Sequence, residues 1–231
     1  ISGVTSLVVS AKEISDLTGI EAFTALEELD CHQNQLTSLD VSANTALTYL
    51  DCNNNQLTSL DVSLNTALIT LQCNNNQLTS LDVSNILGLQ HLEIDNNQFT
   101  SIDVSNNTEL ITLYCSNALT SLDVSGNTSL RYLRLCCNQL TTMDLSSNIE
   151  LHDLTIGNNQ LTYLNMRNGV TGQLYNFNAT GNSGLTCIET LDPDYATANW
   201  TSANGNIDAG VTFAEICYSS NPSYTNVPDD N

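Results

Sequence analysis

Residues 36–56 read LTSLDVSANTALTYLDCNNNQ, and a near copy, LTSLDVSLNTALITLQCNNNQ, occupies residues 57–77. Edited copies begin again at Leu78, Phe99, Leu119 and Leu140. A period of about 21 residues, repeated this often, is typical of a solenoid, in which each unit stacks on its neighbours and shares their core. We therefore expect one continuous array of units in this chain of 231 residues.

The composition is strongly acidic, with 4 Lys and Arg against 25 Asp and Glu and a formal net charge of −21. Such a surface repels phosphate backbones and anionic lipids, which argues against nucleic acid as a partner. No stretch approaches the ~18 consecutive apolar residues of a membrane span, so we expect no membrane insertion.

The central units follow the pattern LxxLxCxxNxLxxLDVSxNxx. Leu and Cys alternate with polar residues in the first half, which predicts a short strand with these side chains inside. Ile and Leu replace Cys in three units, so we interpret this column as small buried hydrophobes. We expect a ladder of amides that bond the backbone of adjacent turns at Asn34, Asn55, Asn76, Asn97, Asn117, Asn138 and Asn159.

This spacing resembles that of leucine-rich repeats, and the resemblance covers residues 4 to about 185. Both halves of each unit look extended, which is similar to the variant found in Bacteroidetes surface proteins. The resemblance implies a right-handed, mainly β leucine-rich-repeat solenoid with two parallel sheets of short strands and little helix. The sequence suggests four segments: a variant, truncated N-terminal repeat (1–25), the array (26–184), a C-terminal cap (185–217) and a linker toward a further module (218–231).

The segment around Cys187 and Cys217 resembles the C-terminal cap of flavobacterial leucine-rich-repeat proteins, in which two such cysteines close a loop around an aromatic residue, here Trp200. The resemblance implies a Cys187–Cys217 disulfide and, with it, an oxidising, extracellular or cell-surface location.

Two irregularities interrupt the array. The string CSNAL at residues 115–119 lacks one residue relative to CNNNQL, which predicts a tightened turn or a local register defect. Cys136 and Cys137 form a vicinal pair in outward positions, which we interpret as bystanders; a redox or metal-binding role is the alternative.

The outward positions of the first half vary while their neighbours repeat, as expected of a recognition surface on a regular scaffold. The alternative is that exposed positions drift and that Tyr is simply a good strand residue. Our candidate residues for a protein or carbohydrate ligand are Tyr49, Asp51, His91, Glu93, Tyr114, Tyr132 and Arg134.

The second half carries a row of carboxylates, at Asp40, Asp61, Asp82, Asp103, Asp123 and Asp144. Like charges stacked ~5 Å apart repel by about 1 kcal/mol per neighbour even in water. We expect each carboxylate to accept hydrogen bonds from its own turn. The alternative is a weak, distributed row of sites for Ca²⁺ or other cations, since carboxylate oxygen suits them. No other cofactor is expected.

Catalytic motifs are missing from the sequence: the three His residues fall in different units, and no G-x-S-x-G, H-E-x-x-H or P-loop occurs. We therefore expect an adhesion or recognition module of a larger surface protein, not an enzyme. The alternative is a structural spacer or filament segment without its own ligand, which bound cations could stiffen and whose partners are the neighbouring modules of the same polypeptide or filament.

Overall fold

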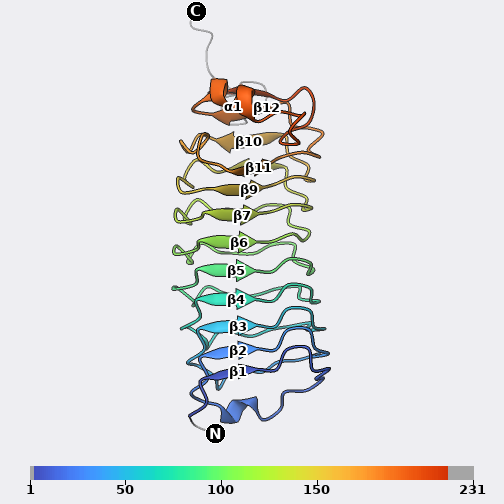
Figure 1. Ribbon diagram of the computed structural model, residues 1–231, viewed down its shortest axis with the longest axis vertical. Coiled ribbons are helices and arrows are strands. Elements are labelled where there is room, and N and C mark those ends of the chain that lie inside the picture. The colour runs from blue at the N-terminus through green and yellow to red at the C-terminus, as the bar shows by residue number, and fades with distance from the viewer. Residues whose placement is uncertain (1–2, 218–231) are drawn as a thin grey trace, which may run out of the picture.

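The computed structural model describes residues 3–217, and its units stack one above the next into an elongated solenoid (Figure 1). Regular helix is confined to the 3₁₀ turn η1 (Ile20–Ala22) and α1 (Pro193–Asn199) among these residues. The strands are three or four residues long, because each extended segment soon ends in a turn. A mainly β solenoid with little helix is what the repeat pattern predicted.

The first halves of the units form one nine-stranded parallel sheet. Its register places the second Leu of each unit beside its counterpart, as in Leu29 with Leu50 and Leu50 with Leu71. The strands, in spatial order, are β1 (Ser6–Val8), β2 (Glu28–Asp30), β3 (Tyr49–Asp51), β4 (Thr70–Gln72), β5 (His91–Glu93), β6 (Thr112–Tyr114), β7 (Tyr132–Arg134), β9 (Asp153–Thr155) and β11 (Asn176–Asn178).

The second sheet is shorter than the sequence pattern predicted. It has four parallel strands, all toward the C-terminal end: β8 (Thr142–Asp144), β10 (Tyr163–Met166), β12 (Cys187–Thr190) and β13 (Thr212–Ala214). In earlier units the second half is irregular, and backbone bonds such as Gln56 N–H to Leu36 O and Gln77 N–H to Leu57 O join adjacent turns.

A continuous apolar core runs through the stack. Cys31, Cys52, Cys73 and Cys115 have no exposed surface, which confirms the predicted inward column. Burial raises the pKa of Cys31 and of Cys115 to about 12, so these thiols stay protonated and serve as small hydrophobic groups.

The predicted asparagine ladder is present. In a typical unit, Asn55 Nδ2 donates to Cys52 O in its own turn and to Cys31 O in the preceding unit, both at 3.1 Å, while Oδ1 accepts the N–H of Leu36. The second half holds a further column of amides, which the repeat pattern did not predict and whose Nδ2 atoms also donate to two carbonyls: Asn44, Asn65, Asn107, Asn127 and Asn148.

The one-residue deletion removes a special backbone position. Turns after the first half contain a left-handed residue, such as Asn54 or Asn75 with φ of 55°, which Asn tolerates better than most residues. The turn at residues 115–119 has none. It is closed instead by Asn138 Oδ1, which accepts the N–H groups of both Asn117 and Leu119 at 3.0 Å. The deletion therefore tightens one turn, while β6 and β7 keep their register.

A small aromatic core closes the C-terminal end. Cys187 and Cys217 form the expected disulfide across a separation of 30 residues. Between them, Trp200 packs on Phe177 with ring centroids 4.1 Å apart and meets Phe213 edge-on at 5.9 Å. The expected linker at residues 218–231 lies outside the described residues.

Candidate recognition surface

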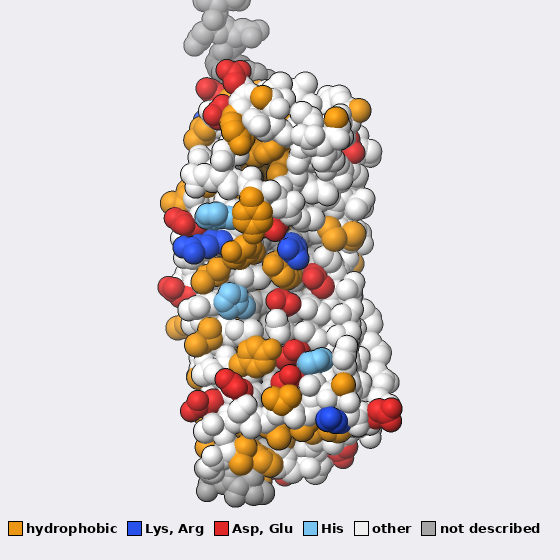
Figure 2. Space-filling view, viewed as in Figure 1, with side chains coloured by type: hydrophobic (Ala, Val, Ile, Leu, Met, Phe, Trp, Pro, Cys, Tyr) orange, Lys and Arg blue, Asp and Glu red, His pale blue; other side chains and the backbone are white. Residues whose placement is uncertain are grey.

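The outer face of the nine-stranded sheet carries two side chains from each strand, one before and one after the buried central residue. Figure 2 views this face and shows hydrophobic, arginine and histidine side chains gathering over β6, β7 and β9. All seven candidate ligand-binding residues lie on strands of this sheet. They do not form one cluster: their contacts divide them between the two ends of the array.

The contacts toward the C-terminal end centre on Arg134. Its guanidinium lies 4.5 Å from the ring centroid of Tyr114 and 3.5 Å from the carboxylate of Asp153. Asp153 is nearly buried and also accepts a hydrogen bond from Asn176. Arg134 is thus held by a ring and a carboxylate, while 47% of its side chain remains exposed for a ligand.

Tyr175 extends this cluster from the position just before β11, where its N–H donates to His152 O as the N–H of His152 donates to Arg131 O. The residue is 68% exposed. Partial desolvation of its hydroxyl, followed by the charge of Asp153 and the neighbouring Tyr132, raises the pKa of Tyr175. We call Tyr114, Tyr132, Arg134, Asp153 and Tyr175 the Tyr–Arg patch.

The contacts toward the N-terminal end are polar. The Tyr49 hydroxyl donates to Gln72 Oε1, and Gln72 Nε2 donates to Glu93 Oε1 at 3.0 Å. Burial and the charge of Asp51 raise the pKa of Tyr49 to about 12. These side chains satisfy one another across three strands, so they offer few unused polar atoms to a ligand.

Asp51 and His91 have local partners. The side chain of Asp51 is only 12% exposed, and it faces His32 and Asp30. His91 Nδ1 lies 3.0 Å from the Thr112 hydroxyl on the next strand. Neither residue is therefore in the Tyr–Arg patch.

The row of carboxylates in the second half has a structural role. Oδ1 of each of the six Asp residues accepts the backbone N–H of the Ser two positions later, at 2.9 Å. Hydrogen bonding by these Ser residues lowers the pKa of Asp40, Asp61, Asp82, Asp103 and Asp123. This geometry supports the turn-stabilising interpretation of the row over the cation-binding one.

Three residues of interest were missing from the sequence-based set. Asp153 pairs with Tyr132 in the register of β7 and β9, and Arg134 lies two residues further along β7. The strand register alone could therefore have placed Asp153 near Arg134. His32 follows Asp30 by two residues, the spacing that puts two side chains on one face. Tyr175 occupies the position of Arg131 and His152 in the preceding units, but 23 residues separate it from His152 instead of about 21, which obscures the repeat at this point.

Comparisons with known proteins agree with this architecture. Residues 24–65 match a family model described as Leucine Rich repeats (2 copies). No match was found among curated proteins. None of the helices in residues 3–217 has the length and apolar character needed to span a membrane.

Several solved structures share the fold. The functional domain of InlJ from Listeria monocytogenes, described as including a cysteine ladder, is 39% identical with a TM-score of 0.74, over 80% of this chain and 44% of that one. A leucine-rich-repeat protein of Leptospira interrogans is 25% identical with a TM-score of 0.63, over 76% of this chain and 45% of the other. This chain thus spans less than half the length of either structure.

A plant peptide hormone receptor, RGFR1 in complex with RGF2, shares the fold alone, at 23% identity and a TM-score of 0.61 over 76% of this chain and 34% of the receptor. In this chain Cys31, Cys52, Cys73 and Cys115 form a buried column. The family match and the shared solenoid architecture support a leucine-rich-repeat protein.

Proposed function

We propose that this chain is an extracellular recognition module of a larger surface protein, and that it acts in adhesion by binding a protein or glycan through the Tyr–Arg patch. The fold favours such a role, because a leucine-rich-repeat solenoid is typically a binding scaffold and not an enzyme. The disulfide and the likeness to the functional domain of InlJ support the extracellular setting.

The observation that carries the proposal is the way Arg134 is held. Binding usually costs the conformational entropy of each long side chain that a ligand immobilises, about 0.5–1.5 kcal/mol. Tyr114 and Asp153 already restrict the guanidinium, so less of that entropy remains to be lost. Arg and Tyr are also the residues that most often dominate binding energy at interfaces.

The distribution of basic residues along the chain points to the same region. Arg131 and Arg134 are two of only four Lys and Arg residues in a chain of net charge −21. An acidic group of the ligand would meet little favourable charge elsewhere on the array. At this patch it would find the Arg134 guanidinium beside the ring of Tyr114.

The test is a binding screen of the purified chain against a glycan array and a panel of purified cell-surface and matrix proteins. A Tyr132→Ala/Arg134→Ala double variant should lose at least ~30-fold in affinity for any ligand found, the equivalent of about 2 kcal/mol for a hot spot. Tyr49→Ala is the matched control, since Tyr49 occupies the same slot as Tyr132 on β3 and should leave binding within about twofold.

Equal binding by the parent and the double variant would move recognition away from the Tyr–Arg patch. Absence of any ligand for the folded parent would favour the spacer role. End-to-end association of chains, unaffected by the double variant, would favour it further.

A further inference from the structure

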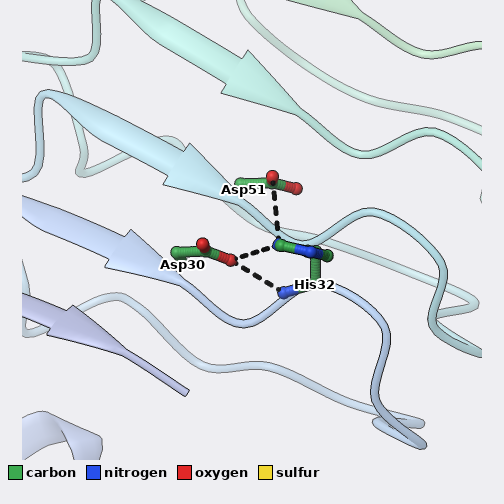
Figure 3. A group of neighbouring side chains, drawn as sticks. All are labelled: Asp30, His32 and Asp51. Atoms are coloured by element: carbon green, nitrogen blue, oxygen red, sulfur yellow. Dashed lines mark hydrogen bonds and ion pairs between the residues drawn. The ribbon is translucent and has the colours of Figure 1, made fainter. Parts of the chain in front are cut away.

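A second group of polar side chains lies at the other end of the nine-stranded sheet. Asp30 ends β2, His32 follows it by two residues, and Asp51 pairs with Asp30 in the register of β2 and β3. Figure 3 shows the three side chains turned toward one another. The stacking of units thus brings together residues 21 positions apart in sequence.

The distances suit a shared ligand. His32 Nδ1 lies 2.6 Å from Asp30 Oδ1 and 3.5 Å from Asp51 Oδ2. One ligand atom from each residue lies within 4.8 Å of the others. In a tetrahedral zinc site with bonds of ~2.0 Å, neighbouring ligand atoms lie about 3.3 Å apart. A small opening of the His32–Asp30 contact would therefore allow one ion to contact all three groups.

Both carboxylates are already oriented by the backbone. Asp51 Oδ1 accepts the N–H of Asn53 at 3.0 Å, which leaves Oδ2 directed at His32. Asp30 Oδ1 accepts the N–H of His32 at 3.2 Å. Outer contacts of this kind fix the orientation of metal ligands in proteins and strengthen binding.

The burial of Asp51 is a second observation that favours a cation at this place. Only 8% of the residue is exposed, and its carboxylate is held close to a second one, Asp30. A bound cation would compensate the charge of both carboxylates.

We propose that Asp30, His32 and Asp51 form a binding site for a divalent transition-metal ion, with Zn²⁺ as the best fit. One imidazole nitrogen and two carboxylate oxygens are ligands that zinc accepts, and three protein ligands leave a position open to water or to a further group. Ca²⁺ fits poorly, because it prefers six to eight oxygen ligands and no nitrogen. The side chains of Asp30 and His32 are 22% and 32% exposed, so an ion can enter from solvent.

The two other histidines lack this arrangement. His91 Nδ1 contacts a threonine hydroxyl, and His152 Nδ1 contacts the carbonyl of Glu150 at 2.6 Å. Among residues 3–217, Asp30, His32 and Asp51 are the one group of three His, Cys, Asp or Glu side chains close enough to share an ion. This site is separate from the Tyr–Arg patch and does not depend on the proposed function.

The test is calorimetric titration with ZnCl₂ in a Cys136→Ser/Cys137→Ser reference protein, so that the two accessible thiols cannot bind the metal. We expect one saturable site per chain and no comparable binding of CaCl₂. Loss of an outer contact alone weakens metal sites about 10–100-fold, so His32→Gln and Asp51→Asn should each lose at least ~10-fold. His91→Gln is the matched control and should bind as the reference does.

Far-UV circular dichroism of each variant shows that the solenoid has folded before it is titrated. Zinc binding that His32→Gln and Asp51→Asn leave unchanged would assign the ion to other surface carboxylates and overturn the proposal. The same holds if the folded reference protein shows no saturable site.

Discussion

At the scale of single residues, the ladder amides hold adjacent units together. Asn76 Nδ2 donates to Cys52 O at 3.0 Å and to Cys73 O at 3.1 Å, and Oδ1 accepts the Leu57 N–H at 3.0 Å. A buried backbone group left without a partner costs about 1–3 kcal/mol. We expect Asn76→Ala to lower the free energy of unfolding by about 3 kcal/mol or more, measured by urea denaturation.

Thr58→Ala is the control for this measurement, because Thr58 is exposed in the same unit and its change should stay within about 0.5 kcal/mol. A similar small effect of Asn76→Ala would mean that water or a shifted turn replaces the amide. The ladder would then be a consequence of the fold and not one of its causes.

The residues of the two sites differ in how far sequence could identify them. Repeat spacing placed Tyr132 and Arg134 outward on one face, and the structure agrees. It did not indicate that Arg134 would turn toward Tyr114 and Asp153, because that choice depends on side-chain rotamers across three strands. The proximity of Asp30, His32 and Asp51 could have been inferred from the period alone.

At the scale of elements, the sequence pattern predicted more strands in the second sheet than the structure contains. Both halves of a unit have extended patterns, yet the second half of the early units forms no strand ladder. The turn that follows is the same with and without a strand: Ser63 donates to Asp61 in an early unit, and Ser146 donates to Asp144, the last residue of β8. Neither the alternating pattern nor this turn therefore reveals which second halves pair.

The turn carboxylates predict how stability changes with pH. Hydrogen bonding by Ser63 lowers the pKa of Asp61, and four further carboxylates of the row behave alike. A carboxyl group whose pKa is lower in the folded state stabilises it above the unfolded value of about 3.9, and this contribution is lost as pH falls through the folded pKa. The urea midpoint should therefore drop as pH is lowered from about 5 to below 3.

An Asp61→Asn/Asp82→Asn double variant should show a smaller drop over the same range, because an amide oxygen still accepts the Ser N–H but does not titrate. A midpoint at pH 7 that rises with CaCl₂ in the parent and not in the variant would contradict the turn interpretation. It would show instead that the row binds cations.

At the scale of the whole molecule, the sequence was most informative, because a solenoid is built from contacts between neighbouring units. Once the period of about 21 residues is known, the order and register of the main sheet follow. The same property makes the ends vulnerable. An end unit lacks one neighbour, so its apolar face must be covered by something other than another repeat.

Residues 185–217, which we expect to act as the C-terminal cap, should therefore depend on their disulfide. Closing a loop of 30 residues contributes about 3.5 kcal/mol in the chain-entropy model. Trp200, the single tryptophan of the chain, packs within this loop and reports on the cap, while far-UV circular dichroism reports on the whole array. In a Cys187→Ser/Cys217→Ser variant, the Trp200 fluorescence transition should move to lower urea and precede the dichroism transition.

The Cys136→Ser/Cys137→Ser variant is the matched control, since it also removes two cysteines but no disulfide, and its two transitions should match those of the parent. If both transitions of the Cys187→Ser/Cys217→Ser variant move together, the cap and the array unfold as one cooperative unit. If neither moves, the stacking of Trp200 between Phe177 and Phe213 closes this end of the solenoid without the covalent bond.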